Sequence, residues 1–237
     1  MIELKNINKK YRHIQVLKDI NLSIEKGSCV VFIGPNGCGK TTLLKCLLNM
    51  VMPDSGCVTI NMIDVGSDCE SRKNLGFMPQ IGCFPENMTV KEIIKTIISV
   101  RKYEKELDKE LYEQFEIESV INKKMNTLSG GTVQKVSASV AFMFNPDIIV
   151  LDEPFAGLDL LAADILRKKI NAEKNNGKTI LITSHTFSEI DGIVSHVVFM
   201  NTGSILFYKP LQELFSTTGK DNVTDAVMCI LKMKQNA

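Results

Sequence analysis

The sequence predicts an α/β fold with a mainly parallel core sheet, an N-terminal antiparallel β subdomain and an inserted α-helical subdomain. Three short segments, residues 29–33, 148–151 and 179–182, are continuously apolar and rich in β-branched residues. Strands that are covered by helices on both faces have this composition. Polar residues follow each segment, and in an open α/β sheet the ligand binds beyond the carboxyl ends of the strands. The three segments therefore predict one active site at one edge of the sheet.

The remaining parts of the chain differ in their hydrophobic period. Ile20, Leu22 and Ile24 alternate with polar residues, which is typical of a half-buried antiparallel strand. Residues from about 85 to 146 carry apolar residues at helical spacing and predict the helical subdomain. We expect one domain over residues 1–209 and a short helical tail over 210–237. The stripes are Val90, Ile93, Ile94, Ile97 and Ile98, then Leu107, Leu111 and Phe115, then Val133, Val136, Val140 and Phe144, and in the tail Ala226, Val227, Ile230 and Leu231.

Composition excludes several classes of protein. The chain has 237 residues and a formal net charge of +1, which gives no basic footprint for nucleic acid. The seven cysteines form no C-x-x-C pair and predict reduced core residues of a cytosolic protein. No apolar run reaches the about 18 residues that a spanning helix needs. If the protein serves a membrane process, the membrane part is expected in another chain.

Residues 34–41 read GPNGCGKT and fit the phosphate-loop pattern G-x-x-x-x-G-K-[ST]. An apolar strand precedes them and a helical pattern follows, which is the context that this loop requires. Backbone N–H groups and the helix N-terminus favour phosphate there, Lys40 is expected on the β- and γ-phosphates, and Thr41 on Mg²⁺. The alternative is a glycine-rich turn. The residues predicted to bind a nucleoside triphosphate are Gly34, Pro35, Asn36, Gly37, Cys38, Gly39, Lys40, Thr41 and Thr42.

Two further motifs narrow the interpretation. Residues 128–131 read LSGG, and residues 148–154 read IIVLDEP, an apolar strand that ends in adjacent carboxylates. With these motifs, the chain resembles the nucleotide-binding domain of ATP-binding cassette (ABC) proteins from about Tyr11 to about Gly203. The resemblance implies a P-loop NTPase of ABC type that binds ATP and Mg²⁺.

The resemblance also implies roles for single residues. Asp152 would hold Mg²⁺ through water, and Glu153 would act as the general base that polarises the attacking water. Gln80 matches the Q-loop glutamine that reaches the metal, His185 the switch histidine at the γ-phosphate, and Tyr11 the aromatic that stacks on adenine. Taken alone, each has a plainer explanation: a surface acidic pair, a loop glutamine, a structural histidine, and a tyrosine of the core or rim.

The LSGG motif implies a dimer. Ser129, Gly130 and Gly131 would open a helix whose N-terminus forms a second anion site. In the family, this motif of one subunit completes the ATP site of the other, so a second ABC subunit is expected, as a homodimer. Residues 157–159 match the D-loop that crosses between subunits. Thr132 departs from the family pattern, which usually has glutamine there.

The first functional hypothesis is the ATPase subunit of an ABC transporter. It would work with a separate transmembrane permease subunit and lie on the cytoplasmic face of the cell membrane. Residues 183–190, TSHTFSEI, resemble exporter subunits, and the short tail lacks room for the regulatory domain of many importer subunits. The alternatives are an ABC ATPase without transport, for example in iron–sulfur cluster assembly, and a small-molecule kinase, against which LSGG and LDEP argue.

Two local hypotheses complete the sequence analysis. Cys38 lies in the phosphate loop beside a helix N-terminus, which favours a thiolate and predicts sensitivity to oxidants and alkylating agents. The alternative is a small residue whose sulfur is turned away from solvent. The mixed-sign run 101–110 predicts a solvated helix face without a function.

Overall fold

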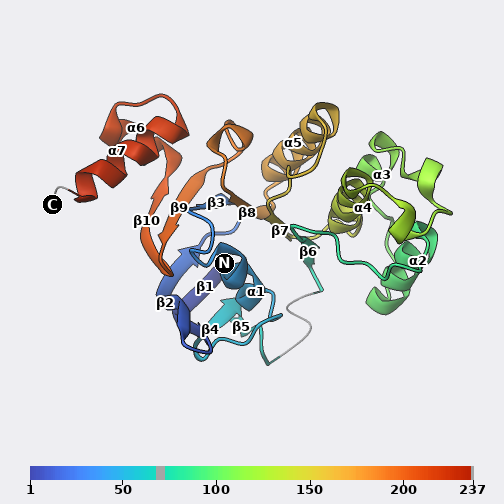
Figure 1. Cartoon of the computed structure of the whole chain (residues 1–237), viewed down its shortest axis with the longest axis horizontal. Coiled ribbons are helices and arrows are strands. Elements are labelled where there is room, and N and C mark those ends of the chain that lie inside the picture. Colours follow the sequence, from blue (N-terminus) through green and yellow to red (C-terminus); the bar gives the residue numbers. More distant parts are fainter. Residues whose placement is uncertain (68–72, 236–237) are drawn as a thin grey trace. The chain divides into compact units, whose positions relative to one another are not determined.

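The computed structural model describes residues 1–67 and 73–235, which belong to two units. Unit 1 comprises Met1–Asp68 and Leu181–Ala237, and unit 2 comprises Cys69–Ile180. The sequence-based division into residues 1–209 and 210–237 stays a prediction. Figure 1 labels the elements of both units.

Unit 1 begins with a four-stranded antiparallel sheet in the order β2-β1-β4-β5. Ile2 of β1 pairs with Ile24 of β2 on one side and with Ile60 of β4 on the other. Ile2, Leu4 and Ile7 are buried, so one face of this sheet contributes to the core. The strands are β1 (Ile2–Tyr11), β2 (Ile14–Ile24), β4 (Ser55–Ile60) and β5 (Ile63–Asp64). The expected N-terminal antiparallel region is confirmed.

A second group of strands in unit 1 includes β3 (Cys29–Ile33), all of whose residues are buried. It pairs in parallel with β9 (His196–Asn201), which pairs antiparallel with β10 (Ser204–Pro210). The loop after β3 leads directly into α1 (Lys40–Leu47). The continuously apolar composition of residues 29–33 thus reports a buried parallel strand.

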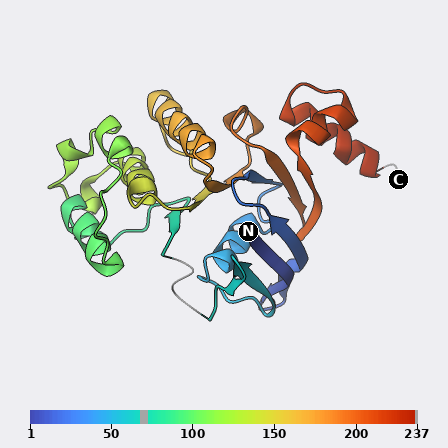
Figure 2. The same cartoon turned by 180° about the vertical axis from the view of Figure 1, so that it is seen from behind.

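The C-terminal tail is a pair of helices instead of the single helix that we expected. They are α6 (Leu211–Thr218) and α7 (Val223–Gln235), which lie side by side in Figures 1 and 2. Gly219 ends α6 with a left-handed backbone at φ 63°, a conformation that glycine adopts readily. The apolar spacing identified α7 correctly, whereas the short α6 gave no separate signal.

Unit 2 contains a parallel pair of strands, β6 (Leu75–Met78) and β7 (Ile148–Asp152). Every residue of β7 is buried. Helix α5 (Leu160–Asn175) follows β7, and β8 (Thr179–Ser184) then carries the chain from unit 2 into unit 1.

The predicted helical subdomain is present in unit 2. Thr89 and Glu92 form a reciprocal capping box at the start of its first helix. The elements are α2 (Val90–Arg101), α3 (Glu110–Gln114), the 3₁₀ turns η2 (Ile117–Val120) and η3 (Met125–Thr127), and α4 (Gly130–Met143). The helix expected around Leu107, Leu111 and Phe115 is shorter than predicted, because Leu107 precedes α3.

A buried ion cluster joins α5 to the start of α3. The Lys169 ammonium, on a side chain that is only 4% exposed, lies 2.6 Å from Asp108, 2.8 Å from Glu110 and 2.7 Å from Glu173. Burial by itself would lower the pKa of Lys169, but the hydrogen bonds that its ammonium donates to the three carboxylates outweigh this effect and raise that pKa.

The interpretation of residues 101–110 as a solvated helix face is wrong about the helix, because residues 102–109 lie between α2 and α3, although most residues of the run are exposed. Helix α2 ends at Arg101, and its C-cap Lys102 has a left-handed backbone at φ 47°. Arg101 donates to the carbonyls of Lys73 and Leu75, and Asp108 belongs to the Lys169 cluster. Charged residues in this run hold backbone and helices in place.

Candidate active site

The phosphate-loop residues of unit 1 lie between β3 and α1. Lys40 is buried, and its ammonium donates to the carbonyls of Gly34 at 2.7 Å and Pro35 at 3.2 Å. The same nitrogen lies 4.0 Å from Sγ of Cys38. Two donors of the lysine thus bind carbonyls of its own loop, which holds the positive charge within the loop.

Two glycines of this loop cannot carry a side chain. A Cβ at Gly34 would lie 2.1 Å from the carbonyl oxygen of Met200. Gly39 has φ +110°, and its Cβ would lie 2.8 Å from the carbonyl oxygen of Val16. The loop is thus pressed against β9 and β2, while Pro35, Asn36 and Gly37 are exposed and Thr41 and Thr42 are half-buried in the first turn of α1. The exposed tip and the helix N-terminus are the parts that a phosphate group can approach.

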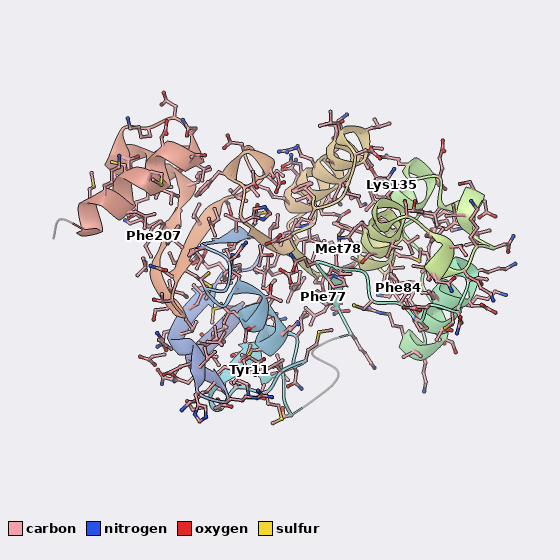
Figure 3. All side chains as sticks on the ribbon, in the orientation of Figure 1. Tyr11, Phe77, Met78, Phe84, Lys135 and Phe207 are labelled. Atoms are coloured by element: carbon pink, nitrogen blue, oxygen red, sulfur yellow. The ribbon has the colours of Figure 1, made fainter. Side chains whose placement is uncertain are left out.

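His185 and Tyr11 are the other predicted site residues of unit 1. His185 is exposed directly after β8, where Ser184 Oγ donates to the carbonyl of Thr186 and shapes the turn. Tyr11 ends β1, is 45% exposed and has the Lys9 ammonium 5.5 Å from the centre of its ring (Figure 3). An exposed ring can stack on a base, so the geometry permits the predicted role, which stays a prediction.

Unit 2 brings together two residues that were predicted from separate motifs. Asp152 ends β7 and is only 3% exposed, and Glu153 follows it with a left-handed backbone at φ 48°. The side-chain amide of Gln80, just beyond β6, donates to Oε2 of Glu153 at 3.3 Å. Because β6 and β7 pair in parallel, their carboxyl ends deliver both side chains to the same place.

The predicted metal ligands have the right chemistry for Mg²⁺. Thr41, Gln80 and Asp152 offer a hydroxyl, an amide and a carboxylate oxygen, and Mg²⁺ prefers such oxygen ligands. The Gln80 amide donates through Nε2, which leaves its oxygen for a cation. Within the described part of the chain, no cluster of three or more His, Cys, Asp or Glu side chains suggests another metal site.

Ser129 begins the helix that follows the LSGG motif. Its hydroxyl is the N-cap of α4 and accepts the N–H of Thr132 at 3.3 Å. Space is open around Gly130, whereas a Cβ at Gly131 would lie 2.9 Å from the carbonyl oxygen of Gly157. The motif therefore lies against residues 157–159, the predicted D-loop.

An ion pair that we did not foresee links the same two segments. The Lys135 ammonium on α4 (Figure 3) lies 2.8 Å from Asp159, whose side chain also accepts the N–H of Ala162 at 2.8 Å as the N-cap of α5. The hydrogen bond from Lys135 lowers the pKa of Asp159. A basic residue shortly after LSGG was the available sequence signal.

The comparisons with known proteins decide the family. The model of the family described as "ABC transporter" matches residues 17–156. The chain belongs to the ABC transporter family. Among curated relatives, the ABC transporter ATP-binding protein NatA of Bacillus subtilis (strain 168) is 29% identical, with 94% of this chain and 95% of NatA covered.

Two further relatives carry transport directions in their names. The molybdate/tungstate import ATP-binding protein WtpC of Thermococcus kodakarensis is 32% identical, with 94% of this chain and 69% of WtpC covered. The lipopolysaccharide export system ATP-binding protein LptB of Haemophilus influenzae is 29% identical, with 87% and 89% covered. Relatives of this ABC chain thus include both import and export proteins.

Solved structures agree with the family. An ATP-binding subunit of an ABC transporter has a TM-score of 0.87 at 25% identity, with 96% of this chain and 98% of that chain covered. The bacterial ABC transporter cassette MJ0796, solved as a dimer, has a TM-score of 0.79 at 27% identity, with 89% and 99% covered. The predicted P-loop NTPase fold of ABC type is confirmed.

Proposed function

We propose that this chain is the ATP-hydrolysing subunit of an ABC exporter and drives transport through a separate membrane subunit. The observation that carries hydrolysis is the 3.3 Å hydrogen bond between Gln80 and Glu153, directly after the buried Asp152. A carboxylate oriented by an amide at the end of a parallel strand is suited to general-base catalysis.

The proposed reaction is the hydrolysis of the terminal phosphoanhydride of ATP. Lys40 and the backbone N–H groups of the phosphate loop bind the phosphates, and Glu153 takes a proton from water as its oxygen attacks the γ-phosphorus. The bond from the γ-phosphorus to the bridging oxygen then breaks, giving ADP and inorganic phosphate. Bound Mg²⁺, held by Thr41, Asp152 and Gln80, would supply charge neutralisation at the phosphates.

The proposed assembly is a two-fold dimer. The N-terminus of α4, with its Ser129 cap and the open space around Gly130, would meet the γ-phosphate held by a second copy. The dimeric form of the similar cassette MJ0796 supports this arrangement. Each ATP would then be enclosed by groups from both copies, so that binding drives closure.

The membrane subunit is proposed to be a separate chain. Among the described residues, no helix has both the length and the apolar character to cross a membrane. Such a subunit would place this protein on the cytoplasmic face of the cell membrane. Export is supported by residues 183–190, which resemble exporter subunits; the names of the relatives do not favour either direction.

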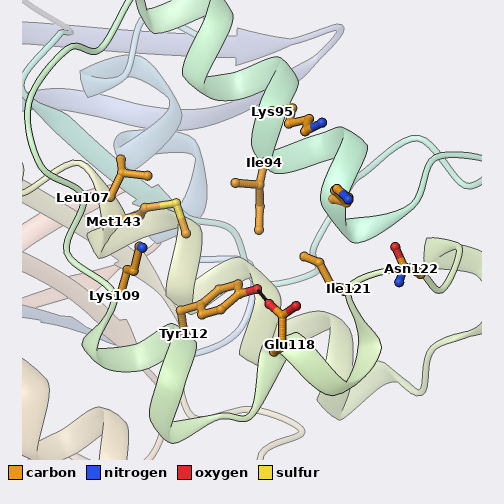
Figure 4. Close-up of a pocket in the computed structure, with 10 residues that line it drawn as sticks. Ile94, Lys95, Leu107, Lys109, Tyr112, Glu118, Ile121, Asn122 and Met143 are labelled. Atoms are coloured by element: carbon orange, nitrogen blue, oxygen red, sulfur yellow. Dashed lines mark hydrogen bonds between the residues drawn. The ribbon is translucent and has the colours of Figure 1, made fainter.

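A cavity of about 350 Å³ in unit 2 has the properties of a docking surface for that membrane subunit. Figure 4 shows Ile94, Leu107 and Ile121 around an apolar interior. The rim carries Lys91, Lys95 and Lys109, and none of them forms an ion pair with another residue that the structure describes. Charge complementarity favours an apolar segment with acidic side chains as the occupant.

At the edge of this cavity, Tyr112 donates a hydrogen bond to Glu118. Burial, together with that hydrogen bond, raises the pKa of Tyr112 to about 12. The phenol therefore stays protonated near neutral pH and donates to Glu118, whose carboxylate is the one acidic group among the lining residues beside the three lysines.

Co-purification from membranes of the native host tests the proposed function. We expect an integral membrane protein to co-purify with the wild-type chain and to stimulate its ATPase activity. The variant Lys91→Glu/Lys95→Glu should lose this partner but keep its own ATPase activity, because both lysines lie on α2. Recovery of iron–sulfur assembly proteins without any membrane protein would instead support the ABC ATPase without transport.

A further inference from the structure

Gln134 is a polar side chain in the interior of unit 2. It lies on α4, five positions after the Ser129 cap, and is 6% exposed. Its Nε2 donates to the main-chain carbonyl of Gln80 at 2.6 Å. Its Oε1 is buried and has no hydrogen-bond partner among the residues that the structure describes.

This burial works against stability. A buried polar atom that lacks a partner is unfavourable, whereas an apolar side chain of similar size has no such disadvantage. The other buried residues of α4 are apolar, such as Val136 and Ala138, or are the small serines Ser137 and Ser139. The presence of a buried amide at position 134 is therefore explained by its hydrogen bond to the carbonyl of Gln80.

A second contact ties the same loop to the same helix. A Cβ at Gly82 would lie 2.7 Å from Cγ1 of Val133. The chain just after Gln80 thus packs against α4 more closely than a side chain would allow. Consecutive residues of the helix, Val133 and Gln134, hold residues 80–82 by packing and by a hydrogen bond.

The connection continues to the proposed general base. Gln134 holds the backbone of Gln80, and the side chain of Gln80 donates to Glu153. At its N-terminus, the same helix carries the LSGG motif, which begins at the Ser129 cap. One helix therefore links the motif that would contact a second copy to the carboxylate that would activate water.

We propose that Gln134 is a positioning residue that sets the orientation of Glu153 through Gln80. In this arrangement, a displacement of the LSGG end of α4 changes the placement of the general base. The proposal rests on the proposed ATPase function, since it assigns a role within that reaction.

The first test separates turnover from binding. Gln134→Met keeps the volume and removes the donor, so kcat should fall about 10-fold, the factor that one lost hydrogen bond corresponds to, while KM for ATP changes less than about twofold. Ser139→Ala is the matched control: Ser139 is buried on the same helix and donates to the carbonyl of Lys135, one turn earlier in that helix. The control should keep wild-type kcat.

Gln134→Glu gives a readout that a merely structural residue would not move. A buried carboxyl has a raised pKa, and only its protonated form can donate to the Gln80 carbonyl. Its kcat, relative to wild type, should therefore rise as the pH falls from about 8 to about 6, whereas the ratio for Gln134→Met should stay constant. Equal pH profiles for the two variants would overturn the proposal.

A fluorescent reporter distinguishes this proposal from the proposed function. The sequence has no tryptophan, and Ile81 is 73% exposed, so Ile81→Trp reports on the loop alone. Acrylamide quenching should increase when Gln134→Met is added, whether or not the protein hydrolyses ATP. A wild-type chain without ATPase activity would contradict the proposed function. Unchanged quenching, or a folded Gln134→Met variant with wild-type kcat, would contradict the role of Gln134.

Discussion

The amide of Gln80 lies 3.3 Å from the carboxylate of Glu153, and it donates from the end of β6 to the residue that follows β7. The parallel register, with Met78 opposite Leu151, brings these distant parts of the sequence together. One residue of this pair is proposed to sense the metal and the other to activate water. The pair is therefore the local centre of the hydrolysis chemistry in unit 2.

Replacing the proposed general base should separate binding from hydrolysis. Glu153→Gln keeps the size of the side chain but removes the proton acceptor, so turnover should fall by about 10²-fold or more while ATP binding persists. Steady-state hydrolysis and nucleotide binding by calorimetry, with the membrane partner present, measure the two effects. Full activity in this variant would remove Glu153 from the general-base role.

The same variant should reveal ATP-driven assembly. With ATP, Glu153→Gln should run as a dimer in light scattering, and without nucleotide as a monomer, because each γ-phosphate needs Ser129 and the glycine N–H groups of a second copy. Adding Gly130→Asp supplies a control: the structure has open space for a side chain at Gly130, but a carboxylate there would repel phosphate. We expect this double variant to remain monomeric. A dimer of the double variant, or a monomer of Glu153→Gln at saturating ATP, would contradict the proposed dimer in which both copies enclose each ATP.

Cys38 should be protected from alkylation even without nucleotide. The side chain is 3% exposed, whereas Cys83 is exposed. Buried thiols react slowly, so maleimide should label Cys38 at least about 10-fold more slowly than Cys83 in the folded protein. Wild type and Cys38→Ala should lose ATPase activity at the same rate, as measured alongside mass spectrometry of the labelled peptides. Faster inactivation of the wild type, with protection by Mg-ATP, would instead support the hypothesis that Cys38 makes this loop sensitive to oxidants and alkylating agents.

Removing Lys169 should destabilise the fold. In Lys169→Met, the Glu173 carboxylate, which is 8% exposed, stays buried without its cation. Breaking a buried pair in this way costs about 3–5 kcal/mol in the free energy of unfolding, which chemical denaturation measures. Glu110→Gln is the matched control, because Glu110 is 46% exposed and a pair of that kind contributes about 0–1 kcal/mol. Equal effects of the two substitutions would show that burial does not govern this cluster.

Sequence reasoning succeeded where local pattern and burial agree. The apolar runs at 29–33 and 148–151 identified strands β3 and β7, because strands buried on both faces admit few polar residues. The phosphate-loop spacing also located the Lys40 loop. Its glycines are required because a Cβ at Gly34 or Gly39 would collide with a neighbouring backbone carbonyl.

Prediction from the sequence failed where the environment of a residue depends on partners that are distant in the sequence. Asp108 looked solvent-exposed because its partner, Lys169, is 61 residues away in the sequence. Gln134 gave no signal, since a polar residue in a helix suggests a surface position unless its partner is known. The two-helix tail was missed because a short helix such as α6 presents few turns over which a period can be seen.

The cap of α4 has a consequence for the kind of ligand that Ser129 can meet. Its Oγ accepts the N–H of Thr132 and lies 2.8 Å from the hydroxyl of the same threonine. When that hydroxyl donates, both lone pairs of the serine are occupied and only its proton remains. A group that can only accept, such as a phosphate oxygen, satisfies this proton, while a ligand seeking an acceptor finds none. Thr132, in the position where the family usually has glutamine, would thus restrict the Ser129 hydroxyl to acting as a hydrogen-bond donor toward a ligand.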